Sequence, residues 1–185
     1  MKQKKKIGAI ALVIILLALL VGNSIAYYSV IGTATNVVTS GNIRLRVIET
    51  GADNNAFPKD GVEVIPGQIV TKRVSVQNIC LHPFWLRVEV TTGSSDAQLK
   101  ADEVMKILDR NTQDWTEHEG YYYYNTILEP LQTTTPLFSQ VQFDGTKVVT
   151  EDIGKALTIT ILASAVQSEN NPADKPWEAS GWPVS

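Results

Sequence analysis

The chain has 185 residues, of which 16 are Lys or Arg and 19 are Asp or Glu, giving a formal net charge of −3. This length suffices for one domain with a hydrophobic core. The acidic balance argues against nucleic-acid binding, which needs a basic surface. The single cysteine, Cys80, excludes an internal disulfide, so we expect packing to stabilise the fold and the thiol to be buried.

Residues 1–26 have the composition of a secretory signal peptide. Four lysines precede the run from Ile7 to Val21, which is apolar apart from one glycine and is shorter than a bilayer-spanning helix. We predict cleavage after Ala26, with Ser24 three residues from the cut. The alternative is an uncleaved anchor helix. Removal of the peptide leaves 12 basic and 19 acidic residues, a net charge of −7.

Alternation of apolar and polar residues predicts β-strands along most of the remaining chain. In residues 84–92, for example, Val88 and Val90 alternate with Arg87 and Glu89, as expected for half-buried strands. Turn signals such as Pro-Gly and Asp-Gly separate the segments. We therefore predict a mainly β fold, a jelly-roll-like antiparallel β-sandwich. The other segments with this pattern are 42–49, 70–79, 137–143 and 157–167.

One segment, residues 94–109, has helical spacing instead. Ser95 and Gln98 have the spacing of a capping box. We expect one inserted helix over about 95–109 that lies on the sandwich and turns its apolar stripe to the core. The stripe consists of Ala97, Ala101, Val104, Met105 and Leu108.

Four consecutive tyrosines occupy residues 121–124. In a strand, Tyr121 and Tyr123 share one face while Tyr122 and Tyr124 share the other, so the four rings cannot form one stacking platform for bases or sugars. One pair would enter the core, and the other would face water or a neighbouring chain. Because tyrosine is common at interfaces, all four are interface candidates.

The residues suited to catalysis are few. His82 precedes a proline in a predicted turn, and His118 lies between Glu117 and Glu119, on the opposite face from both in a strand. The sequence has no HExxH zinc motif, no G-x-S-x-G nucleophile elbow and no Gly-rich phosphate loop. We therefore predict no catalytic, metal or cofactor-binding residues, although a triad of sequence-distant residues stays open.

The end of the sequence, residues 169–185, is polar with prolines and two tryptophans, and we expect it to be irregular. It carries no apolar anchor and no LPxTG-type sorting signal. The predicted organisation is a signal peptide (1–26), an extended N-terminal segment (27–35), the β-sandwich (36–168) and a polar C-terminal tail (169–185).

Several blocks, in order, resemble a known family. These are NSIAYYSVIGTATNVVTSGNIRLRV, VIPGQIVTKRVSVQN, PFWLRVEV, EGYYYYNTILEPLQTTTPLFSQVQF and ITILASAVQSENN. Together they resemble the TasA/camelysin-like proteins, which the ER-type signal peptidase of Gram-positive bacteria processes. The fourth block carries Leu131 where glycine is common in the family.

The resemblance implies an exported jelly-roll protein of the cell surface or biofilm matrix. TasA-like members form fibres in which the N-terminal segment of one subunit completes the sheet of the next. Here that donor segment would include Tyr27, Tyr28, Val30 and Ile31, which are apolar and β-prone and would gain backbone hydrogen bonds at a sheet edge. The alternative is that this segment forms the first strand of its own sandwich.

The sequence therefore predicts a secreted, non-enzymatic structural protein that assembles with itself or with a related matrix subunit. Its other expected partner is the signal peptidase, and it meets the membrane only through the signal peptide. Two alternatives remain. One is a secreted metal-dependent protease, a label given to camelysin-like proteins that no zinc motif supports here. The other is an adhesin or carbohydrate-binding module that uses outward tyrosines.

Overall fold

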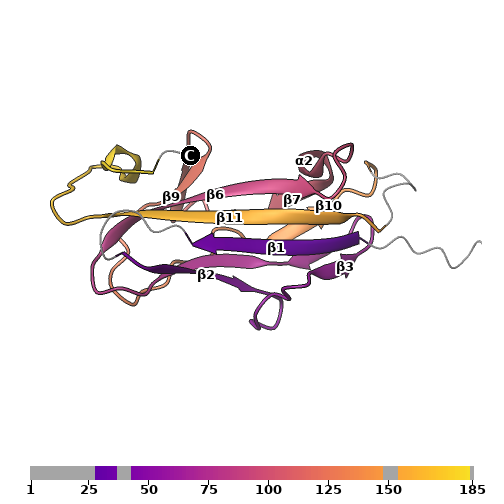
Figure 1. Ribbon diagram of the computed structural model, residues 1–185, viewed down its shortest axis with the longest axis horizontal. Helices are drawn as coiled ribbons and strands as arrows, with labels where there is room; N and C mark the ends of the chain where they lie inside the picture. Colours follow the sequence, from indigo (N-terminus) through magenta and orange to yellow (C-terminus); the bar gives the residue numbers. More distant parts are fainter. Residues whose placement is uncertain (1–27, 37–42, 148–153, 184–185) are drawn as a thin grey trace, which may run out of the picture.

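The computed structural model describes residues 28–36, 43–147 and 154–183; the predicted signal peptide and Tyr27 lie outside them. The fold is mainly β, as the alternation predicts, and its strands form three sheets (Figure 1). The strands are β1 Tyr28–Asn36, β2 Leu45–Thr50, β3 Val62–Val64, β4 Ile69–Thr71, β5 Arg73–Asn78, β6 Phe84–Ser94, β7 Met105–Leu108, β8 Trp115–His118, β9 Tyr121–Tyr124, β10 Gln140–Phe143 and β11 Ala156–Gln167.

The largest sheet has six strands in the order β3-β1-β11-β6-β9-β8. Its centre is the long antiparallel pair of β6 and β11, which runs from Leu157 opposite Ser94 to Gln167 opposite Phe84. The strand pairs in the three sheets are antiparallel, with one exception: β1 runs parallel to β11. β1 and β11 therefore point toward the same end of the molecule (Figure 1).

Two smaller sheets complete the core. One has the order β4-β10-β7 and the other pairs β2 with β5. Their apolar side chains form a single buried cluster with those of β6 and β11, so the core lies between the large sheet and the two small ones. Alternation decides which residues enter it: Leu157, Ile159 and Ile161 of β11 are all fully buried.

The predicted helix over 95–109 is wrong for most of its length. Only Ala101–Val104 form a helix, α2, and the chain continues directly into strand β7. The predicted capping box does not form, because Ser95 Oγ accepts a hydrogen bond from Ala156 N–H and the Gln98 N–H bonds to an aspartate instead. Residues of the predicted stripe are nevertheless buried in the core, namely Ala101, Val104 and Met105.

The residues after β11 lie back on the sheet. They are irregular, as predicted, apart from a 3-10 turn, η2, at Pro176–Glu178. Asn171 holds this segment in shape, since its side chain bonds to Gln167 O and to both backbone groups of Ser180. Its carbonyl accepts a hydrogen bond from Trp85 Nε1 at 3.1 Å. Across the described parts of the chain, no helix has the length and apolar character needed to cross a bilayer.

Candidate functional site

The two sets of predicted assembly residues occupy different parts of the large sheet. Tyr28, Val30 and Ile31 lie in β1, between β11 and β3 of the same chain. The tyrosines form β9, near the opposite edge. The cleavage residues Ser24 and Ala26 fall outside the described ranges. In the single chain, the N-terminal segment thus forms a strand of its own sheet, which was the alternative to donation.

The tyrosine strand is the second half of a tight hairpin. β8 ends at His118, and the turn consists of Glu119 and Gly120, which have φ values of 50° and 82°. Two successive residues with positive φ are typical of the type I′ turn that matches strand twist. The hairpin fixes the register, pairing Trp115 with Tyr124 at its open end. The predicted alternation follows directly, with two tyrosines on each face.

On the outer face, Tyr121 and Tyr123 lie under the C-terminal segment. Trp177 and Trp182 both contact the Tyr123 ring edge-on, with centroids 6.0 and 5.5 Å away, and Trp177 also stacks on His118 at 4.9 Å. Tyr123 is only 4% exposed as a result. The outward pair therefore packs against the chain's own tail. Sequence reasoning missed this cover, although the two tail tryptophans were its signal.

Arg87 lies at the centre of this outer cluster. Its guanidinium is 4.0 Å from the Tyr121 ring centroid and 4.9 Å from that of Trp182, and its Nη2 donates to the carbonyl of Pro183. Arg87 is 8% exposed, and no described carboxylate lies within ion-pair distance of it. Cation–π contacts thus replace a counter-charge here.

We predict that Trp182→Ala weakens the folded state. The change removes a ring from both Tyr123 and Arg87 and opens the buried guanidinium to water. We expect a loss of about 2 kcal/mol in the free energy of unfolding, from lost apolar burial and ring contacts. Urea titration followed by fluorescence measures it. Trp177→Ala is the control, since Trp177 does not contact Arg87 and should cost less.

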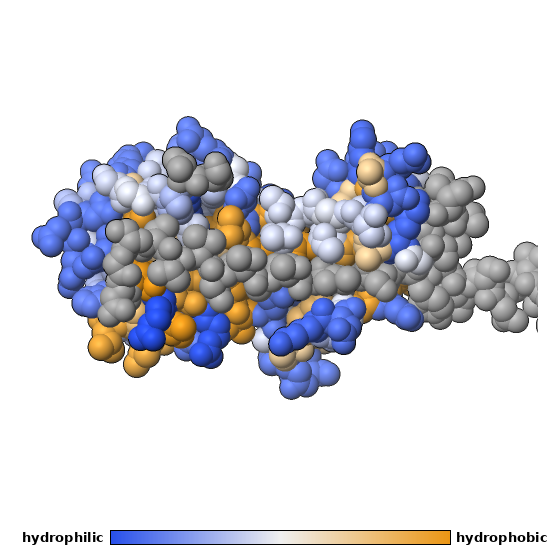
Figure 2. Space-filling model, in the orientation of Figure 1, coloured by the Kyte–Doolittle hydropathy of each residue, from blue (hydrophilic) through white to orange (hydrophobic). Residues whose placement is uncertain are grey.

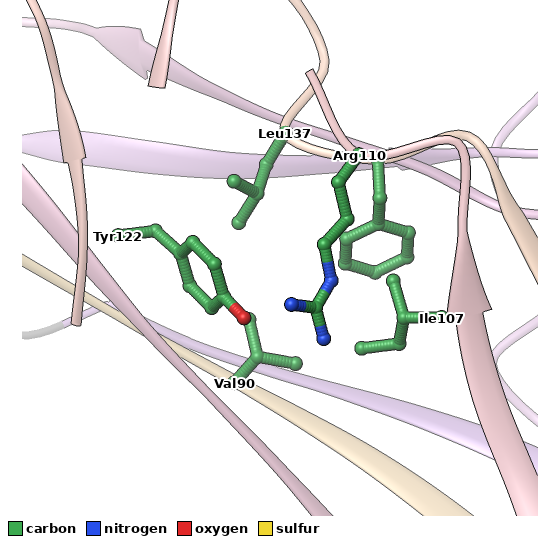
Figure 3. Close-up of a pocket in the computed structure, with 6 residues that line it drawn as sticks. Val90, Ile107, Arg110, Tyr122 and Leu137 are labelled. Atoms are coloured by element: carbon green, nitrogen blue, oxygen red, sulfur yellow. The ribbon is translucent and has the colours of Figure 1, made fainter. Parts of the chain in front are cut away.

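On the inner face, Tyr122 and Tyr124 turn toward the core, and Tyr124 contacts Trp115 with ring centroids 5.1 Å apart. Tyr122 lines an open groove of about 360 Å³ between β6, β7 and α2. In Figure 3 the Arg110 side chain reaches across this groove toward Tyr122 and Ile107. The walls of its apolar end are Val90, Ile107, Tyr122, Leu137 and Phe138.

At the polar end of the groove, the charge of Arg110 is balanced by Glu117. Arg110 Nη1 lies 3.3 Å from Glu117 Oε2, and its guanidinium is 5.4 Å from the Tyr122 ring centroid. Burial raises the pKa of the Tyr122 hydroxyl, which Arg110 opposes and Glu117 reinforces. Tyr122 is therefore a neutral hydrogen-bonding group, suited to packing and positioning and not to acting as a base near neutral pH.

The two histidines are far from forming a metal centre. His82 Nδ1 is 3.9 Å from Glu169, and His118 Nε2 is 3.9 Å from Glu119, each at the surface. Within residues 28–36, 43–147 and 154–183, no group of three His, Cys, Asp or Glu side chains converges. Cys80 is buried, as predicted, at 3% exposure. Its thiol donates to Asn78 Oδ1 at 3.0 Å.

Comparison with known proteins adds no assignment. No family model, no curated protein and no solved structure matches the chain significantly.

Proposed function

We propose that this is a secreted structural protein of the cell surface or biofilm matrix, built on a jelly-roll-like sandwich, that assembles with its own copies by strand donation. The observation that carries the proposal is β1. A nine-residue strand next to the predicted cleavage site lies in parallel beside β11, so its place could be taken by the same strand from another copy.

The pairing of β1 suits this strand to exchange between copies of the chain. Eight consecutive register pairs join it to β11, from Ser29 opposite Ala156 to Asn36 opposite Ala163. On its other side only Tyr28 to Val30 pair, with β3. The strand thus pairs with two segments distant in sequence, and a donated copy would make the same backbone pairs. Repeated one-way donation would build a fibre, whereas reciprocal donation would close a pair.

We predict that proline in β1 weakens assembly at positions whose N–H bonds to β11. In a strand, successive N–H groups point to opposite sides. At one of positions 32 and 33 the N–H therefore bonds to β11, and proline removes that hydrogen bond. At the other position the N–H points away from β11, so proline there removes no bond to it. The mature protein with each change is compared with wild type by light scattering and negative-stain microscopy. We expect the two variants to differ, with one raising the concentration for half-assembly by about tenfold or more.

Deletion of residues 27–33 is the stronger arm of the same experiment. It should abolish assembly, and a synthetic peptide of residues 27–36 should then bind the shortened protein. If wild type stays monomeric at all accessible concentrations, or if the deletion leaves assembly unchanged, strand donation is wrong.

A further inference from the structure

Two leucines are exposed to an unusual degree at one end of the sandwich. Leu81 is 80% exposed and Leu131 is 70% exposed, more than any other large apolar residue among those described. Figure 2 shows apolar surface at the lower left of the view, at the end where β2 begins in Figure 1. We name the exposed side chains of Leu81 and Leu131 the end patch.

Hydrogen bonds to Asn78 hold both leucine-bearing loops at this end. The Asn78 side chain donates to His82 O at 2.9 Å and to Leu128 O at 3.0 Å, and its N–H donates to Gln132 O. Leu81 and Leu131 therefore lie in two neighbouring loops, both of which are hydrogen-bonded to the buried Asn78. A rigid base under exposed leucines is an arrangement suited to contact with a partner.

Leu131 also occupies a backbone conformation that disfavours it. Its φ is 64°, in a turn closed by a hydrogen bond from Gln132 N–H to Glu129 O, with Pro130 at the preceding position. Such a turn favours glycine at this place. A bulky apolar residue here is strained and, in the single chain, also exposed. Both costs are accounted for if the side chain is buried in an assembly.

The course of the chain indicates which partner covers the end patch. Six residues, 37–42, connect Asn36 at the end of β1 to Ile43, so these two Cα atoms lie within about 25 Å of each other in any arrangement. Arg44 O accepts a hydrogen bond from Ile79 N–H, two residues before Leu81. The chain that follows the connection, from Ile43 onward, therefore lies beside the end patch of the same copy.

The same end receives β1. Asn36 is opposite Ala163, four residues before Gln167, which pairs with Phe84, three residues after Leu81. If β1 of one copy enters another, its short connection holds Asn36 in the second copy within about 25 Å of Ile43 in the first, and so keeps the two end patches near each other. We propose that the end patch is the contact surface between copies of this chain in the strand-exchanged assembly, an inference that rests on the proposed function.

The test uses the mature protein with Leu81→Ser, Leu131→Gly and both changes. We expect the double variant to raise the concentration for half-assembly by about tenfold or more. Leu131→Gly alone should weaken assembly while leaving the unfolding midpoint of the monomer equal or higher, since glycine relieves the positive φ. A loss of assembly through misfolding would lower that midpoint instead.

The matched control is Ile69→Ser. Ile69 is 49% exposed and lies nine residues before Asn78, roughly 30 Å toward the other end at 3.3 Å per residue. Unchanged assembly of this variant, beside weakened assembly of the leucine variants, supports the end patch. If the leucine variants assemble as wild type does while deletion of residues 27–33 abolishes assembly, the end patch is wrong and strand donation stands. If the deletion leaves assembly intact, the proposed function fails whichever way the leucine variants behave.

Discussion

Replacing Asn78 by alanine should lower the free energy of unfolding by about 3 to 5 kcal/mol, because the four hydrogen bonds of its buried side chain are lost at once. Asn78 is fully buried at the end of β5. Its Nδ2 donates to two carbonyls, those of His82 and Leu128, and its Oδ1 accepts from the N–H of Cys80 at 2.9 Å.

The reason for the large effect is that water cannot replace these bonds without opening the structure. A typical hydrogen bond contributes about 0.5 to 1.5 kcal/mol, and a buried group left without a partner costs about 1 to 3 kcal/mol. Leu128 O keeps the bond from Phe84 N–H and His82 O keeps the bond from the Cys80 thiol, so the larger cost falls on the Cys80 N–H. The Cys80 thiol also bonds to Asn78 Oδ1. We therefore expect Asn78→Ala to make Cys80 react faster with a thiol reagent, in addition to lowering the urea midpoint.

Asn125→Ala is a matched control for this change. Asn125 also accepts one hydrogen bond, from Thr116 Oγ1, and donates another, to Gln113 O. It lies at a half-buried position where water can take over both, so its loss should cost about 1 kcal/mol or less. Equal urea midpoints for the two variants would contradict the role given to Asn78.

The strands could be predicted from the sequence because one face of each is buried. Alternation located β2, β5, β6, β10 and β11. β2 and β10 each start three residues later than predicted, and the predicted segment 70–79 is divided between β4 and β5. It failed over 95–109 because Met105 fits a helical stripe with Leu108 as well as a strand face with Ile107. The partner strand that decides between them is β10, where Phe143, 38 residues further on, lies opposite Met105. Over so short a segment, the helical and the strand periods fit the apolar residues almost equally well.

The tail and the groove could not be predicted for a different reason. The contacts of Arg87 with Trp182, and of Arg110 with Tyr122, join residues whose proximity follows from the three-dimensional path of the chain. The inward position of Lys72 could have been predicted from the sequence but was not. It is in phase with Val74 and Val76, so alternation alone places this cationic side chain on the inner face.

Glu49→Gln should destabilise the fold by about 3 to 5 kcal/mol near neutral pH, because it leaves the Lys72 ammonium buried without a counter-charge. Lys72 is 1% exposed. Its Nζ lies 2.7 Å from Glu49 Oε1 and 4.0 Å from the centroid of the Phe57 ring, which closes the site from outside. The carboxylate is therefore the charged partner on which this buried cation depends.

The double variant Lys72→Met/Glu49→Gln separates this cause from lost packing. Without the ammonium, the missing carboxylate no longer matters, so the double variant should recover most of the loss or exceed wild type. Lys72→Met alone should cost less than Glu49→Gln, since the Glu49 side chain retains 13% exposure and can still be hydrated. A double variant as unstable as Glu49→Gln would show that packing, and not charge, is at issue.

The pH dependence gives a second signature of the same pair. Burial lowers the pKa of Lys72 below its ordinary value of 10.5, and Glu49 opposes the shift. Between the folded and the unfolded pKa the unfolded chain binds more protons, so the Lys72 contribution to stability increases as the pH rises through the folded pKa toward 10.5. Loss of the Glu49 charge lowers the folded pKa further, and the increase should start at a lower pH. Urea titrations from about pH 7 to 9.5, below the range where tyrosines ionise, should show a rising stability for Glu49→Gln relative to the double variant, and a flat difference would refute the assignment.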